Sequence, residues 1–79
     1  MRIETYKGYN IVCGHIYPVE ELKIGQRWIG SSGNIVTIIN IDGRWVDYSW
    51  ETGKHCKDSF AFQCRYSLII ENQLTTPIT

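Results

Sequence analysis

Tryptophan rings and positive charges fall close together between residues 44 and 57. Trp45 and Trp50 lie in this segment, and the basic or imidazole side chains near them are Arg44, Lys54, His55 and Lys57. Aromatic faces can stack on a base, and cations can form charge-assisted hydrogen bonds with phosphate. The segment is therefore a candidate site for a nucleotide or another phosphate ligand. Because no P-loop or GxGxxG sequence accompanies it, solvated surface charge is the competing interpretation.

Cysteine and histidine occur together twice, at Cys13-Gly14-His15 and at His55-Cys56. Thiolate and imidazole are good zinc ligands, and the two clusters could supply four of them. Structural zinc sites, however, place paired ligands roughly two to four residues apart, and neighbours in a strand point to opposite faces. We therefore expect unrelated buried thiols and surface imidazoles, with no metal and no other cofactor.

Catalytic pairs have equally little support. His55 does not face Cys56 from the next position of a strand, and nothing in the sequence fixes Asp47 beside His15 or His55. A chain of 79 residues also has little depth in which to enclose a dehydrated active site. We expect a binding protein rather than an enzyme.

The charge balance bears on the kind of partner. Eight basic and eight acidic side chains give a formal net charge of zero. Nucleic-acid binding usually needs a basic excess, so this class starts at a disadvantage. A near-zero charge also reduces repulsion between copies of the chain, which favours self-association.

The sequence also predicts a compartment. The first ten residues, MRIETYKGYN, are too polar for a signal peptide, and no run approaches the roughly 20 apolar residues that span a bilayer. Three cysteines, Cys13, Cys56 and Cys64, cannot all pair within one chain. We therefore expect a reduced, cytoplasmic location and no membrane contact.

The first 18 residues have the pattern of a hairpin followed by a short connection. Residues 2–6 and 9–13 flank Lys7-Gly8, a plausible tight turn, and residues 2–6 alternate as a half-buried strand does. Pro18 restricts Tyr17 to extended geometry, and Tyr17 joins the candidate binding residues. Residues 19–23 are long enough for one helical turn only.

A meander of strands follows from Gln26. Residues 31–34, SSGN, have turn chemistry, and residues 35–41 are almost entirely β-branched. Asp42-Gly43 predicts a type I′ turn into a returning strand, residues 44–50. Because alternation breaks in the first of these strands, we expect a bulge near Ile39-Asn40 that turns Val36, Ile38 and Ile41 inward.

Strand parity separates the aromatic residues. In the returning strand, Val46, Tyr48 and Trp50 share one face, whereas Trp45, Asp47 and Ser49 share the other. The second face carries a carboxylate, so we expect it to meet solvent and to leave Trp45 exposed. An alternative is that Trp45 caps the sheet or rests on the N-terminal hairpin. Large aromatic side chains fill small cores well, and we assign four to the core: Trp28, Tyr48, Phe62 and Tyr66.

The end of the chain predicts a short helical turn and one more strand. Asp58 or Ser59 can cap a turn that places Phe62 and Tyr66 on one side, and a last strand is expected over residues 67–70. Residues 72–79 have the composition of a flexible tail. The expected fold is mainly β: one domain over residues 1–79, a small five-stranded antiparallel SH3-like barrel with one short helical turn and the hairpin of residues 1–18 as an extension.

One pattern supports this fold by resemblance. It runs through Gly25-x-x-Trp28, Gly33, Val36-Thr37-Ile38, Trp45-Val46-x-Tyr48 and Phe62-x-x-Arg65-Tyr66-x-Leu68. It resembles small SH3-like proteins encoded by bacteriophages and covers about half of the chain, mostly at core and turn positions.

The resemblance implies a non-enzymatic inhibitor of a bacterial host defence component, acting in the host cytoplasm. Two modes are open, capping a host protein or sequestering a nucleotide signal, and a homo-oligomer would help to enclose a nucleotide. Two other classes remain as alternatives: an SH3-like nucleic-acid-binding module, and a structural or assembly protein that pairs through its exposed strand edges.

Overall fold

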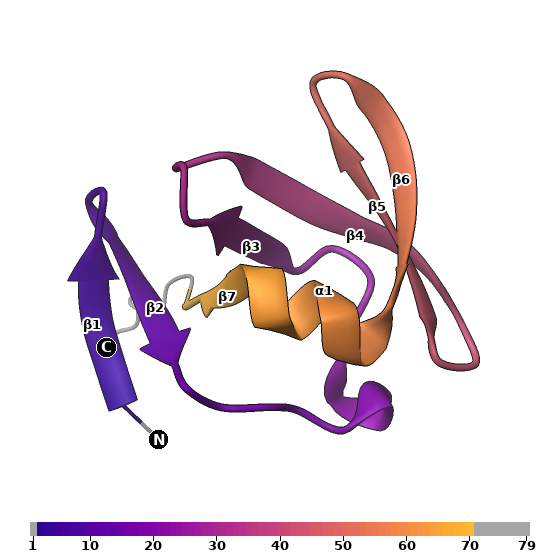
Figure 1. Cartoon of the computed structure of the whole chain (residues 1–79), viewed down its shortest axis with the longest axis horizontal. Coiled ribbons are helices and arrows are strands. Elements are labelled where there is room, and N and C mark those ends of the chain that lie inside the picture. Colours follow the sequence, from indigo (N-terminus) through magenta and orange to yellow (C-terminus); the bar gives the residue numbers. More distant parts are fainter. Residues whose placement is uncertain (1, 71–79) are drawn as a thin grey trace, which may run out of the picture.

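The computed structural model describes residues 2–70, and Figure 1 shows their arrangement. They form one antiparallel sheet with the strand order β1-β2-β7-β3-β4-β5-β6. The mainly β fold predicted from the sequence is thus confirmed. The elements, in chain order, are β1 (Arg2–Tyr6), β2 (Tyr9–Cys13), the 3₁₀ turn η1 (Val19–Glu21), β3 (Arg27–Gly30), β4 (Ile35–Asp42), β5 (Trp45–Trp50), β6 (Gly53–Asp58), α1 (Ser59–Arg65) and β7 (Tyr66–Ile69).

The sheet is open, whereas the strand pattern of the sequence predicts a closed barrel. Strands β3 to β7 include the predicted meander, with α1 directly before β7. However, β2 pairs with β7 through Ile11↔Ile69 and Val12↔Leu68, so the N-terminal hairpin occupies one edge of β7 and β3 occupies the other. In the described chain β1 and β6 are left as the two edges of a seven-stranded sheet. Barrel closure is therefore not confirmed.

The N-terminal hairpin forms as predicted, but its burial differs. Lys7 and Gly8 have φ values of 54° and 85°, the pair of positive angles that a type I′ turn requires. The predicted half-burial of β1 is wrong, because its first four residues are exposed. The hairpin buries β2 instead, at Ile11 and Val12, because β2 is the strand that meets the rest of the sheet.

The β4–β5 hairpin contains the predicted bulge. The register between these strands shifts between Ile38 and Asn40, so Val36 and Ile38 are buried and Ile41 packs against the same core. The turn lies one residue later than predicted. Asp42 pairs with Trp45, and the loop is Gly43-Arg44 with a positive φ, 59°, at Gly43 alone. That is the pattern of a type II′ turn rather than type I′.

Two apolar cores lie on opposite faces of the sheet. Trp28 and Ile29 are neighbours on β3, so their side chains point to different faces, and each is almost fully buried. On the Trp28 face, α1 and the segment around η1 cover the strands; this core contains Leu22, Trp28, Val36, Ile38, Val46, Tyr48 and Phe62. On the other face, the hairpin covers a smaller core of Ile11, Ile29 and Ile69.

All four aromatic residues assigned to the core lie there. Phe62 is the centre: its ring is 5.1 Å from Trp28, 5.0 Å from Tyr48 and 4.9 Å from Tyr66, measured between ring centroids. Trp28, Tyr48 and Phe62 are buried, and Tyr66 is partly buried against them. Such offset and edge-on ring pairs add to the stabilisation from buried area.

Helix α1 has one of the two N-caps predicted for it. The Asp58 carboxylate accepts a hydrogen bond from the Phe60 N–H at 2.8 Å. The last strand begins one residue earlier than predicted, at Tyr66, and ends at Ile69. The tail expected at residues 72–79 lies outside the described residues.

Two phenylalanines on α1 allow a matched test of this core. Phe62 is fully buried, whereas Phe60 is 60% exposed. We expect Phe62→Ala to lower the free energy of unfolding by about 3–5 kcal/mol, because it empties the centre of the aromatic core. Phe60→Ala should change it by no more than about 0.5 kcal/mol. Urea titrations followed by circular dichroism measure both; equal losses in the two variants would contradict this placement of α1.

Candidate binding surface

Trp45 is exposed, as strand parity predicts. It begins β5, and 47% of its surface is accessible. The Arg44 guanidinium lies 5.5 Å from the centre of its ring, within the range of a cation–π contact. The other two members of this face, Asp47 and Ser49, are only half-buried. The indole therefore stands at the end of the strand, beside a positive charge and open to solvent.

One carboxylate joins this strand end to the helix. Asp58 Oδ2 lies 2.9 Å from Arg44 Nε, while its Oδ1 accepts the hydrogen bond from Phe60 N–H. In addition, the Ser59 N–H donates to the Arg44 carbonyl oxygen at 2.7 Å. The ion pair and the Ser59–Arg44 hydrogen bond therefore join the turn before β5 to the start of α1 at two points, and the cap fixes Asp58 on the helix. We call this surface, made of Arg44, Trp45, Asp58 and Phe60, the Trp45 corner.

Phe60 belongs to this surface although sequence reasoning did not select it. It is exposed, and its backbone is held next to Arg44 through Asp58 and Ser59. The sequence contained a usable indication. A helix that starts at Ser59 and turns Phe62 and Tyr66 inward must turn Phe60 away from them. The Arg44–Asp58 ion pair thus joins two segments that each carry a large exposed ring, Trp45 on β5 and Phe60 on α1.

The remaining predicted residues of β5 and β6 lie elsewhere. Trp50 is at the far end of β5 from Trp45, roughly 17 Å away at the rise of an extended strand. Trp50 is also partly buried against the core. Lys54 pairs with Ser49 near the same end. The predicted cluster is therefore divided between the two ends of the β5–β6 hairpin.

His55 and Lys57 lie on the core-facing side of β6 and not beside Trp45. His55 stacks on Tyr48 with 5.6 Å between ring centroids, and its Nε2 lies 3.0 Å from Thr52 Oγ1. Lys57 pairs with Val46, so it shares the face opposite to that of Trp45. Of the predicted cations, only Arg44 contacts the Trp45 ring.

Tyr17 lies on another part of the molecule. Its N–H donates to Gln63 Oε1, and Gln63 Nε2 donates to its carbonyl oxygen at 2.9 Å. Its ring meets Trp28 and His15 edge-on, with centroid distances of 6.1 and 4.4 Å. Burial raises the pKa of the Tyr17 phenol. Tyr17 therefore ties the connection at residues 14–17 to α1.

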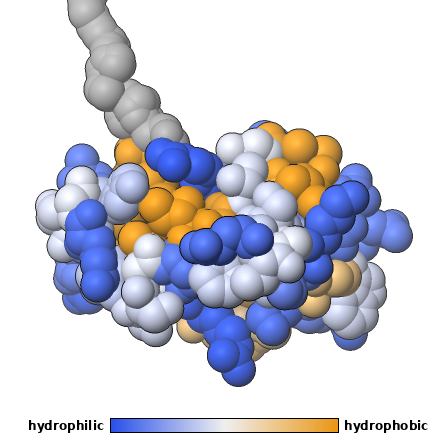
Figure 2. All heavy atoms as spheres, turned by 90° about the horizontal axis from the view of Figure 1, so that it is seen from above, coloured by the Kyte–Doolittle hydropathy of each residue, from blue (hydrophilic) through white to orange (hydrophobic). Residues whose placement is uncertain are grey.

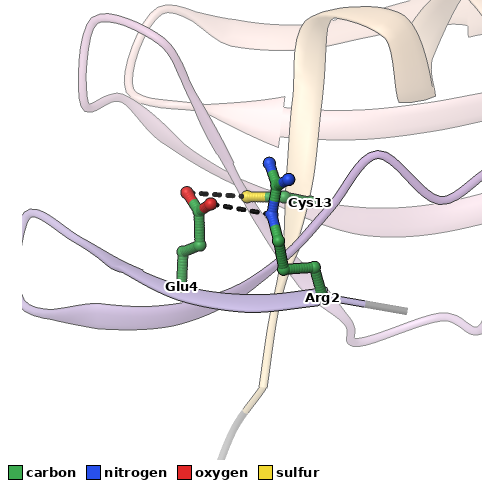
Figure 3. Close-up of polar contacts among 3 residues, drawn as sticks. All are labelled: Arg2, Glu4 and Cys13. Atoms are coloured by element: carbon green, nitrogen blue, oxygen red, sulfur yellow. Dashed lines mark hydrogen bonds and ion pairs between the residues drawn. The ribbon is translucent and has the colours of Figure 1, made fainter.

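The two Cys–His clusters are far apart in the sheet. Cys13 lies on β2 and Cys56 on β6, with β7, β3, β4 and β5 between them. Among residues 2–70, no three His, Cys, Asp or Glu side chains gather closely enough to hold a metal ion. Cys13 instead donates to Glu4 Oε1 at 3.4 Å, and Glu4 also pairs with Arg2, as Figure 3 shows.

Both environments disfavour the thiolate, but the prediction that these thiols are buried is wrong, since Cys13 is half-buried and Cys56 is exposed. Partial burial and the hydrogen bond to Glu4 raise the pKa of the Cys13 thiol. A hydrogen bond to Asp47 is the main reason that the pKa of Cys56 is raised as well. A nucleophilic cysteine needs the opposite shift, which a nearby cation or imidazolium would provide. Asp47 and Cys56 face each other across β5 and β6, whereas His55 is on the other face.

Three comparisons were made with known proteins. Neither protein-family models, nor curated proteins, nor solved structures gave a match to this chain. Within residues 2–70, no helix combines the length and the apolar character needed to cross a bilayer.

The Asp47–Cys56 contact predicts a change in thiol reactivity. Asp47→Asn removes the negative charge that holds the Cys56 pKa up, so more thiolate is present at pH 8. We expect iodoacetamide to alkylate Cys56 several-fold faster in this variant. Peptide mass spectrometry measures the rate, with Cys64 in the same sample as the reference. An unchanged Cys56-to-Cys64 rate ratio would show that Asp47 does not control the thiol.

Asp58 can be tested by separating its two contacts. Asp58→Asn keeps an oxygen that can cap α1 but loses the charge that pairs with Arg44, whereas Asp58→Ala loses both. Loss of the cap costs about 0.5–2 kcal/mol, and an exposed ion pair contributes less. Thermal unfolding should therefore rank the stabilities wild type, Asp58→Asn, Asp58→Ala. An alanine variant as stable as the asparagine variant would rule out the capping role.

Proposed function

We propose that this chain is a non-enzymatic binding protein that caps another protein through the Trp45 corner. The observation that carries the proposal is a pair of exposed rings, Trp45 at the start of β5 and Phe60 in the first turn of α1, on segments that the Arg44–Asp58 ion pair joins. Interface residues with the largest effect on affinity are enriched in tryptophan and arginine. An exposed Trp with an Arg against its ring therefore has the composition of an interface anchor.

The rigidity of the corner supports the same conclusion. Three polar contacts fix the backbone between Arg44 and Phe60 before any partner arrives. Binding then costs less conformational entropy than it would from a flexible loop. On the face in Figure 2, apolar surface gathers in separate areas among hydrophilic side chains.

The class of target follows from the resemblance to small SH3-like phage proteins. The run β7-β3-β4-β5-β6, with α1 before β7, supports an SH3-like part to which the β1–β2 hairpin has been added. On that basis we propose a bacteriophage protein that acts in the host cytoplasm. Its target is a component of a bacterial defence system, and capping that component inhibits it.

The geometry favours capping over the other candidate functions. A nucleotide bound through the predicted cluster needs its stacking ring and its phosphate ligands in one place, but Trp50, Lys54 and His55 lie at the other end of β5 from Trp45. A nucleic-acid module needs a basic excess, and the net charge is zero. The raised pKa values of Cys13 and Cys56 disfavour thiol catalysis.

Assembly through the strand edges is also less favoured. The edge strand β1 carries Arg2 and Glu4, and β6 carries Lys54, Lys57 and Asp58. Charged side chains on edge strands oppose edge-to-edge pairing. We therefore place the recognition surface at the corner and not along β1 or β6.

Capture of a partner from bacterial lysate tests the proposal. Tagged protein should retain one major host protein, and Trp45→Ala and Phe60→Ala should each weaken that complex by about 2 kcal/mol or more, as central interface residues do. Titration calorimetry with the purified partner measures the loss.

Ile24→Ala is the matched control. Ile24 is 63% exposed, so this variant removes a similarly accessible apolar side chain outside the corner. It should bind as the wild type does, and all three variants should unfold at nearly the wild-type temperature. If Ile24→Ala weakens the complex while both ring variants bind normally, the corner is not the interface.

A further inference from the structure

A concave surface lies away from the Trp45 corner. A pocket of about 580 Å³ opens where the N-terminal hairpin, the connection at residues 14–17, the end of α1 and the start of β7 meet. Figure 1 shows this connection leaving β2 and running along one side of the molecule to η1. Small-molecule sites are generally about 300–1,000 Å³ and mostly apolar, with few polar groups. We call this surface the Tyr17 pocket.

The pocket walls are fixed by contacts between distant parts of the chain. Gln63 holds both backbone polar groups of Tyr17, so the connection is tied to α1. The Tyr6 hydroxyl donates to the Ser31 carbonyl oxygen, which ties the hairpin to the end of β3. Gly14 has a φ of 69°, and a Cβ built on it would have no neighbour within 4 Å, so the space beside it is open. The hollow is therefore present before any ligand binds.

Three tyrosines belong to the lining. Tyr17 and Tyr66 are partly buried, so each still offers surface to a ligand, and Tyr6 lines the pocket from the hairpin. Rings of this kind bind flat apolar or aromatic groups by stacking and edge contacts. The lining thus suits a planar ligand body.

The charged groups of the lining favour an anion. Glu4 has its charge balanced by Arg2, with 2.8 Å between Nε and Oε2, and its other oxygen accepts from Cys13. Arg65 also lines the pocket, and it has no carboxylate partner among residues 2–70. A guanidinium can bind a carboxylate or phosphate through two parallel hydrogen bonds.

From these observations we infer that the Tyr17 pocket binds a small molecule with a flat aromatic body and one acidic group. The body lies against Tyr17 and Tyr66, and the acidic group pairs with Arg65. This site does not rest on the protein-capping function proposed above, since the Trp45 corner uses the first turn of α1 and the pocket uses its last turn.

NMR titration of the ¹⁵N-labelled chain tests the inference with four probes. 2-Naphthoate and adenosine 5′-monophosphate carry the acidic group as carboxylate or phosphate, and 2-naphthamide and adenosine are their neutral counterparts. At least one acid should give saturable shifts centred on the amides of Gly14, Arg65 and Ser67, and its neutral counterpart should bind about tenfold more weakly. The acid that binds more tightly shows whether the pocket prefers a carboxylate or a phosphate.

Variants separate a specific site from general charge attraction. Arg65→Gln should weaken binding of the acid about tenfold, because a charge-assisted hydrogen bond is lost, whereas Arg65→Lys should retain part of it. Lys57→Gln removes a cation elsewhere and should bind as the wild type does, as should Trp45→Ala.

Three results would overturn the inference. They are no saturable shift with either acid at millimolar concentration, shifts centred on the Trp45 corner, and equal binding of the acid by Arg65→Gln and the wild type. The spectrum of each variant shows directly whether it is folded. Because Trp45→Ala enters only as a control, failure here leaves the capping proposal standing.

Discussion

A chain of 79 residues must cover both faces of a single sheet, and this constraint shapes the whole molecule. Trp28 and Ile29 are neighbours on β3, so their side chains lie on opposite faces of the sheet, and both are buried. Helix α1 and the segment around η1 cover the first face. The N-terminal hairpin extends the sheet by pairing β2 with β7, and its Tyr6 and Tyr9 pack against the core on the second face. That pairing also occupies the free edge of β7, so the sheet stays open.

Both proposed sites arise where the covering elements join the sheet. The Trp45 corner is the junction at which β6 passes into α1, and Asp58 serves both the helix cap and Arg44 there. The Tyr17 pocket lies where the connection at residues 14–17 passes the end of α1. Hydrogen bonds between Gln63 and the Tyr17 backbone hold the connection there. Polar contacts that stabilise the fold therefore also hold exposed rings in fixed positions.

Local patterns predicted local structure well. Alternation and turn residues gave the strands, the bulge after Ile38 and the exposed face of Trp45, because each depends on a few neighbouring residues. The closed barrel was not confirmed, since closure depends on which distant strand pairs with the free edge of β7, and that strand is β2. No local feature of the sequence predicts the pairing of β2 with β7. The type II′ turn at Gly43-Arg44 differs from the predicted turn by one residue, a shift that the bulge in β4 allows.

The same reasoning explains the candidate site. Proximity in sequence grouped Trp45 with Trp50, Lys54 and His55, but an extended strand carries Trp45 and Trp50 to opposite ends. Phe60 was missed because its exposure depends on where α1 begins, and Arg65 because its pocket requires the hairpin, the helix and β7 together. Surfaces built from several elements become visible only once their packing is known.

The central claim is that Trp45 and Phe60 meet a protein partner directly. The most direct measurement is the ¹H–¹⁵N spectrum of the labelled chain during titration with the partner captured from lysate. The account predicts that the Trp45 indole resonance and the Phe60 amide shift or broaden first, while the Trp28 indole is unaffected. If those signals stay in place while amides of β1 or of the Tyr17 pocket respond, partner recognition occurs elsewhere and the account is wrong.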